Sequence, residues 1–168
     1  MTETLSAVMP DEVEAMAHAY LKEACDRDLT LATAESCTGG LLASLLTDVE
    51  GASHAFERGF IVYSEQAKCE LLGIAAEKIE RCGAVSREVA VAMAEGAIAH
   101  SAADIALAIT GFAGRAGPDD EVGLVHFGCA RRDGKTSHRE AHFGDIGRGP
   151  VRIACMRVAL EMMREAMA

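Results

Sequence analysis

Hydrophobic and polar positions along the chain alternate between two kinds of pattern. Short continuous apolar runs are typical of buried strands, and apolar residues that recur every three or four positions are typical of helices with one buried face. The runs predict strands at residues 29–34, 56–63, 105–110, 122–132 and 136–143. The three-to-four spacing predicts helices at residues 10–28, 41–48, 66–72, 77–81 and 86–100, and a last helix that starts at Pro150.

Local signals mark the ends of two of these helices. Ser64 and Ser86 each precede a helical pattern, where a serine oxygen can accept a hydrogen bond from a free backbone N–H. Gly73 follows the pattern at 66–72 and can adopt the left-handed conformation that closes a helix. We therefore expect both helices to begin directly after a serine.

The order of elements favours one fold class. Helices lie between most of the five strands, and the last two strands flank Asp133-Gly134, a strong hairpin signal. This order predicts an α/β protein, a three-layer α/β/α sandwich with a mixed, mostly parallel five-stranded sheet. We expect residues 1–168 to form a single domain, because this length suits one hydrophobic core. In such sheets ligands bind at the carboxyl ends of the parallel strands.

Composition and charge narrow the possible partners. The formal net charge is -10, from 26 acidic and 16 basic residues, which disfavours nucleic acid as a partner but leaves room for a small anion. No apolar run reaches the roughly 20 residues of a membrane span. Six cysteines without a CxxC pair, and no basic secretory segment at the N-terminus, predict a cytoplasmic protein with reduced thiols. An apolar hairpin and an Ala-rich helix lead us to expect a homo-oligomer.

The segment at 33–40, TAESCTGG, joins the first strand pattern to the second helix pattern and is the candidate site of chemistry. A strand that turns directly into a helix places the turn at the sheet edge, next to free N–H groups of the helix. Ser36 is the candidate nucleophile, and Lys68, early in a later helix, is the candidate base, because burial and the helix dipole both disfavour its charged form. The alternative is that Ser36 caps its helix and Lys68 is a solvated surface residue.

Two more side chains near this turn are candidates. Tyr63, at the end of the second strand, could donate to an oxyanion or relay a proton, or its hydroxyl could simply face water. Cys37 is a rival nucleophile, because a helix N-terminus lowers the pKa of a thiol. Strand alternation points Cys37 and Ser36 in opposite directions, so we expect a buried thiol.

Three histidines in the two hairpin strands, His126, His138 and His142, could suggest a metal site. A two-residue hairpin turn pairs His126 with Ala141. That register points His126 to the face opposite His142, so the three rings would not converge. No metal site is expected.

Two loops near the sheet edge carry glycines and arginines. The glycines of TGFAG at 110–114 could let the backbone approach a ligand, although a plain flexible loop explains them equally well. Arg115, Arg148 and Arg152 lie in or just after the two loops. Each could bind a phosphate through its planar fork of donors, or be a surface charge.

Taken together, these segments resemble the CinA carboxy-terminal domain family, the nicotinamide-nucleotide amidases. The resemblance covers nearly the whole chain in the same order, and its first two motifs are distinctive. The matching segments are TAESCTGG at 33–40, FERGF at 56–60, Tyr63-Ser64, Ala67-Lys68, GAVS at 83–86, TGFAG at 110–114, Val122-Gly123 and Gly144-Asp145. Larger members carry a molybdopterin-binding-like domain before this one, whereas this chain resembles the stand-alone form.

The resemblance implies a metal-free amidohydrolase, without a cofactor, that converts nicotinamide mononucleotide to nicotinate mononucleotide and ammonia. It places the family's catalytic serine on Ser36, its lysine on Lys68 and its tyrosine on Tyr63. The implied partner is the small-molecule nucleotide, with its phosphate near the loop at 110–114 and Arg152. The expected substrate-binding residues are Thr38, Gly39, Gly40, Thr110, Gly111, Ala113, Gly114 and Arg152.

The chain departs from the family pattern in two loops that are expected to face the ligand. The family loop usually continues with Pro, several glycines and Lys-Pro, but residues 115–121 read RAGPDDE, which is shorter and more acidic. Ile146 stands where the family tends to have Arg after the Gly-Asp pair. Two alternatives therefore remain: a non-catalytic nucleotide-binding module of the same fold, and an amidase with a different amide substrate.

Overall fold

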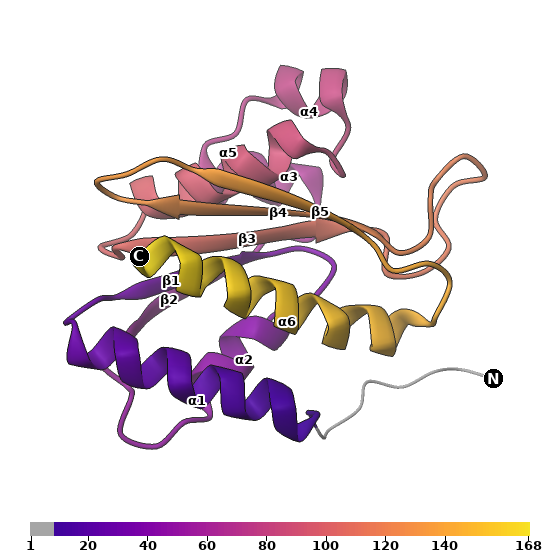
Figure 1. Ribbon diagram of the computed structural model, residues 1–168. Helices are drawn as coiled ribbons and strands as arrows, with labels where there is room; N and C mark the ends of the chain where they lie inside the picture. Colours follow the sequence, from indigo (N-terminus) through magenta and orange to yellow (C-terminus); the bar gives the residue numbers. More distant parts are fainter. Residues whose placement is uncertain (1–8) are drawn as a thin grey trace.

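The computed structural model describes residues 9–168 (Figure 1), and the elements expected from the hydrophobic pattern are present. The helices are α1 (Asp11–Asp26), α2 (Leu41–Thr47), α3 (Glu65–Leu72), α4 (Ala76–Cys82), α5 (Arg87–Ala99) and α6 (Arg148–Met167). The strands are β1 (Leu31–Glu35), β2 (Phe56–Ile61), β3 (Ile105–Gly111), β4 (Leu124–Arg131) and β5 (Ser137–His142). No helix within the described residues is long and apolar enough to cross a membrane.

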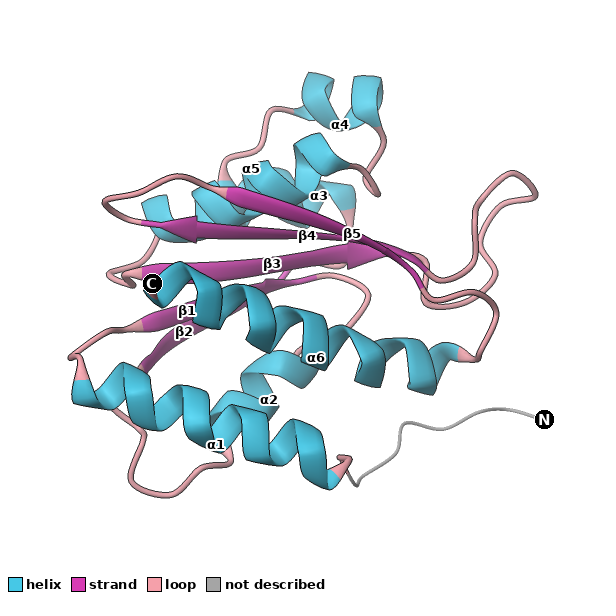
Figure 2. Ribbon diagram, in the orientation of Figure 1, coloured by secondary structure: helices cyan, strands magenta, loops and turns pink. Residues whose placement is uncertain are grey.

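The five strands form one sheet in the order β2-β1-β3-β4-β5 (Figure 2). β1 pairs in parallel with both β2 and β3, whereas the β3–β4 and β4–β5 pairs are antiparallel. Only β4 therefore runs against the other four strands. The predicted mixed, mostly parallel sheet is confirmed, and the carboxyl ends of β1, β2 and β3 meet at one edge.

Helices cover both faces of the sheet, as the sandwich prediction required. α1, α2 and α6 pack on one face, and α3, α4 and α5 on the other (Figure 1). Alternate residues of β3 point to opposite faces of the sheet: Leu107 packs in the layer of α1, α2 and α6, and Ala106 in the layer of α3, α4 and α5. The small side chains on the second face let α5 approach closely: a Cβ at Gly128 would lie 2.3 Å from the carbonyl oxygen of Ala90.

The predicted helix caps are confirmed. Ser64 Oγ accepts a hydrogen bond of 3.0 Å from the N–H of Ala67, and Ser86 Oγ accepts one of 3.3 Å from Val89. Gly73 ends α3 with a φ of 67°. The start of α3, which carries Lys68, is therefore held in place by its own local sequence.

The β4–β5 hairpin corrects one prediction, the pairing of His126 with Ala141. In the structure His126 pairs with Glu140. The N–H of Gly134 donates to the carbonyl of Arg131, so the turn closes one residue earlier than the hairpin signal suggested. A register shift of one residue moves side chains to the opposite face. The expectation that the three histidines point to different faces was therefore wrong.

Candidate active site

The strand-to-helix turn after β1 lies at the carboxyl edge of the sheet. Ser36 follows β1 directly and donates its N–H to the carbonyl of Ile109 at 3.0 Å, which continues the ladder between β1 and β3. Gly39 and Gly40 have φ values of 60° and 98°, a region that side chains disfavour, and they turn the chain into α2. We call residues 36–40 the elbow. It presents Ser36 at the sheet edge, where the residue is 7% exposed.

Lys68 lies beside Ser36. It belongs to the first turns of α3, is only 1% exposed, and its Nζ lies 3.0 Å from Ser36 Oγ. The same Nζ contacts the carbonyl oxygens of Val62 at 2.9 Å and Tyr63 at 3.3 Å. Lys68 is thus not a solvated surface residue. It is the buried partner of the serine.

The surroundings of Lys68 favour its uncharged form. Burial lowers the pKa of Lys68, and the more distant acidic groups of Cys37, Glu65 and Cys69 offset this shift only in part. Within residues 9–168 its three polar contacts are all to neutral oxygens, so no carboxylate holds the proton on the amine. An uncharged amine within hydrogen-bond distance of a hydroxyl can accept its proton.

The Cys37 side chain packs away from this pair, into the apolar layer formed by α1, α2 and α6. A hydrogen bond from Cys155 on α6 lowers the pKa of Cys37, against the opposing effect of burial, and the same bond raises the pKa of Cys155. The backbone carbonyl of Cys37 accepts a hydrogen bond of 2.8 Å from Arg152 Nε. Arg152, expected near the ligand phosphate, is therefore attached to the elbow.

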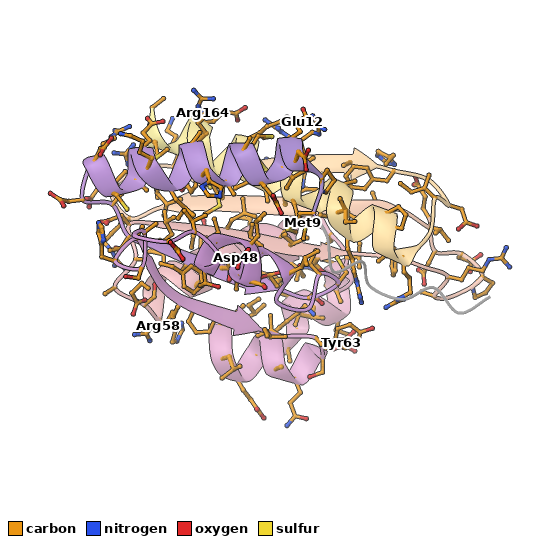
Figure 3. All side chains as sticks on the ribbon, turned by 90° about the horizontal axis from the view of Figure 1, so that it is seen from below. Met9, Glu12, Asp48, Arg58, Tyr63 and Arg164 are labelled. Carbon is orange, nitrogen blue, oxygen red and sulfur yellow. The ribbon has the colours of Figure 1, made fainter. Side chains whose placement is uncertain are left out.

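A pocket of about 410 Å³ opens next to the Ser36–Lys68 pair. Its walls include seven of the expected site residues, namely Ser36, Tyr63, Lys68, Thr110, Gly111, Ala113 and Gly114. Tyr63 is 66% exposed and lies beyond the end of β2 (Figure 3). Thr110 Oγ1 donates to the carbonyl of Ala84 at 2.8 Å, so this hydroxyl fastens the pocket wall.

Four expected substrate-binding residues do not line this pocket: Thr38, Gly39, Gly40 and Arg152. Thr38 is 3% exposed, and its hydroxyl donates to the carboxylate of Glu35 at 2.6 Å. Glu35 is completely buried, and no role for it was predicted from the sequence. Its position was a usable signal, because a carboxylate at the end of a buried apolar strand needs specific partners.

The pocket is lined by basic groups. Lys68, Arg115 and Arg148 contribute to its walls, and no Asp or Glu does so among the described residues. Arg148 is the first residue of α6, because the helix begins two residues before Pro150. Pro150 lies in the first turn of the helix, where proline is tolerated. A Cβ at Gly114 would lie 2.9 Å from Arg148 Cγ, so Gly114 makes room for this side chain. Two arginines in the pocket wall of a chain of net charge -10 suit an anionic ligand.

The three histidines gather on one face of the hairpin, outside the pocket. His126 Nδ1 and His138 Nε2 lie 3.0 Å apart. His142 contacts Glu121 and Glu140, each at 2.6 Å. These side chains pair with one another, and within residues 9–168 no group of three or more His, Cys, Asp or Glu side chains could hold a metal ion.

Comparison with known proteins places this architecture in context. Residues 13–167 match the profile of a family described as the CinA C-terminal domain. A putative competence-damage inducible protein of Acetivibrio thermocellus is 42% identical over 160 residues, covering 94% of this chain and 38% of that protein. A CinA-like protein of Akkermansia muciniphila is 51% identical over 112 residues, covering 66% and 27%. The chain thus spans about a third of the length of these curated relatives.

Solved structures match along nearly the whole chain. A competence/damage inducible protein of Agrobacterium tumefaciens is 41% identical with a TM-score of 0.93, covering 97% of this chain and 100% of that one. A CinA superfamily protein of Escherichia coli is 33% identical with a TM-score of 0.86, covering 95% and 94%. None of the names of these four proteins states a reaction.

Proposed function

The chain belongs to the CinA C-terminal domain family, and we propose that it is an amidohydrolase in which Ser36 is the nucleophile and Lys68 the base. The observation that carries the proposal is the 3.0 Å separation between Ser36 Oγ and Lys68 Nζ in a buried setting. A serine hydroxyl is a weak nucleophile at neutral pH and needs such a partner. The proposed substrate is nicotinamide mononucleotide, as the family resemblance implies.

The proposed reaction has two halves. In the first, Lys68 takes the hydroxyl proton while Ser36 Oγ bonds to the carboxamide carbon, and backbone N–H groups of the elbow, aided by Tyr63, bind the oxyanion. The carbon–nitrogen bond then breaks, and the Lys68 ammonium returns its proton to the departing nitrogen, which leaves as ammonia. In the second half, Lys68 takes a proton from water, and the hydroxide oxygen attacks the carbonyl carbon of the ester. The bond to Ser36 Oγ then breaks, and the Lys68 ammonium returns the proton to Ser36.

The pocket supports a phosphorylated substrate. Arg115 and Arg148 line the same pocket as the catalytic pair and the loop at 110–114, and would bind a phosphate by charge and hydrogen bonds. The carboxamide would then lie at Ser36. All six cysteines are free thiols in the structure, which agrees with the cytoplasmic location proposed for a nucleotide-recycling enzyme.

The test is ammonia release from nicotinamide mononucleotide by the purified protein. We expect Ser36→Ala and Lys68→Met to abolish release, while Ser44→Ala on the exposed side of α2 and Lys135→Met in the exposed hairpin loop keep it. Cys37→Ala should retain most activity, because its thiol faces the core. Inactive Cys37→Ala with active Ser36→Ala would transfer the role to the thiol.

Two other outcomes correspond to the alternatives left by the altered loops. Binding of the nucleotide without ammonia release would identify a non-catalytic binding module. Ammonia release from other amides only would identify an amidase with a different substrate. Either result would contradict the proposed reaction while leaving the fold unchanged.

A further inference from the structure

Glu35, the last residue of β1, is a fully buried carboxylate directly before Ser36. Both of its oxygens accept hydrogen bonds. Oε2 accepts from Thr38 Oγ1 at 2.6 Å and from the N–H of Leu42 at 3.0 Å, and Oε1 accepts from the N–H of Ala43 at 2.9 Å. The carboxylate therefore joins the end of the strand to both the elbow and the first turn of α2.

The three donors to Glu35 are neutral: one hydroxyl and two backbone N–H groups. Burial of a carboxylate is unfavourable unless it is well hydrogen-bonded, and three charge-assisted bonds at the positive end of a helix meet this need. The geometry also selects a carboxylate. An amide would direct its NH2 group at one of the two backbone N–H groups, where no acceptor is available.

This network restricts the elbow. Gly39 and Gly40 let the chain turn, but glycine also gives the backbone freedom that would move Ser36. The hydrogen bonds that Glu35 accepts brace the elbow, because they tie the residue before it to its middle residue, Thr38, and to the first turn of α2 after it. A nucleophile displaced by 1 Å can lose about 100-fold in rate, so holding Ser36 Oγ at Lys68 Nζ has direct value for catalysis.

The same network determines what the start of α2 can bind. Leu42 and Ala43 donate their N–H groups to Glu35, so these two donors are not offered to a substrate phosphate. Thr38 is likewise engaged with Glu35 and is buried away from the pocket. Within the elbow, only Ser36 and Cys37 line the pocket.

We propose that Glu35 is a positioning residue for the Ser36 nucleophile, acting through Thr38 and the first turn of α2; this inference rests on the proposed function. Glu35 does not line the pocket, so its loss should change the chemical step and not substrate binding. Thr38 contributes to the same positioning of Ser36 through the hydrogen bond that its hydroxyl donates to Glu35.

The experiment compares Glu35→Gln, Thr38→Val and Thr38→Ser with the wild type and with Ser44→Ala. Both Glu35→Gln and Thr38→Val keep the size of the side chain. Glu35→Gln replaces one acceptor oxygen of the carboxylate, and Thr38→Val removes the hydroxyl that donates to it. We expect kcat for ammonia release to fall about 10- to 100-fold in both, with KM and the pH midpoint of kcat/KM unchanged, since neither group contacts Lys68 or the pocket. Thr38→Ser, which restores the hydroxyl, should recover most of the rate lost in Thr38→Val.

A second readout separates this proposal from the proposed function. A fluorophosphonate reagent labels an activated serine without an amide substrate, and we expect slower labelling of Ser36 in Glu35→Gln and Thr38→Val than in the wild type. Equal labelling rates, or a raised KM with unchanged kcat, would overturn the positioning role. If Glu35→Gln does not fold, the two Thr38 variants decide. Labelling of the wild type without ammonia release would reject the substrate alone, and neither labelling nor release would reject both proposals.

Discussion

The amine of Lys68 lies 3.0 Å from the hydroxyl of Ser36, although 32 residues separate them in the chain. The sheet explains this proximity. β1 and β2 are parallel neighbours, so Ser36 after β1 and the start of α3 after β2 meet at one edge. The carbonyls of Val62 and Tyr63 then receive the amine at the point where it reaches the serine.

The pH dependence of catalysis should report the burial of Lys68. Its pKa is lowered by burial, and the base is the uncharged amine, so kcat/KM should rise with pH and level off above a midpoint below the ordinary lysine value of about 10.4. Steady-state kinetics over a pH series measures this midpoint. Lys68→Arg should lose activity at every pH, because a guanidinium stays charged. A rate that falls with rising pH would contradict the role of a neutral lysine.

The two arginines of α6 should differ in their kinetic effects. Arg148 lies in the pocket wall, so Arg148→Met should raise KM for nicotinamide mononucleotide about tenfold, the effect of losing one charged contact. Arg152 holds the Cys37 carbonyl at the elbow, so Arg152→Met should lower kcat more than it raises KM. Separate determination of kcat and KM tests both variants. The opposite assignment would support the phosphate role that the sequence suggested for Arg152.

Gly128 should be essential for the packing of α5 on the sheet. A Cβ there would lie 2.3 Å from the backbone oxygen of Ala90, which cannot move without shifting the helix. Gly128→Ala should therefore destabilise the protein by about 1–3 kcal/mol, the range for overpacked cores. Denaturant unfolding measures this loss. Gly134→Ala is the control, because its Cβ would meet only the Arg131 side chain, and equal stabilities of the two variants would refute the packing argument.

The pair formed by buried His126 and half-buried His138 should make the stability of the fold depend on pH. Burial is the main cause that lowers the pKa of both His126 and His138; each also lies near the charge of Glu88 and Glu140, and His138 near Arg87. Their pKa values in the folded state are below the unfolded value of about 6.5. The neutral pair therefore contributes its full stability above pH 6.5, and this contribution is lost as the pH falls through the two folded-state pKa values.

The matched variants are His138→Gln and the exposed His54→Gln. His142 acts in the opposite sense, since Glu121 and Glu140 raise its pKa, so a difference between variants is more informative than the total slope. Unfolding free energies measured between pH 7 and pH 5 should fall less steeply for His138→Gln than for the wild type. Parallel slopes in all three proteins would show that the pair does not titrate on unfolding.

Much of the fold could be read from local patterns. The apolar runs, the serine caps at Ser64 and Ser86, and the glycines of the elbow each act over a few residues, and the structure confirms them. The hairpin register could not be read in this way. The turn closes at Arg131 and Gly134, and a displacement of one residue there reverses the facing of every side chain along β5.

The residues of the site also divide into those that local sequence predicts and those that only tertiary structure places. Sequence alone was enough to select Ser36 and Lys68 as a candidate pair, because a strand-to-helix turn and an early helical lysine are local features and the family resemblance covers both. Tertiary structure decided which other residues lie near them. Arg148 lies in the pocket wall, Arg152 binds the Cys37 carbonyl of the elbow, and the Glu35 carboxylate accepts a hydrogen bond from the first turn of α2. Such contacts between distant segments depend on how the helices pack on the sheet and not on local spacing.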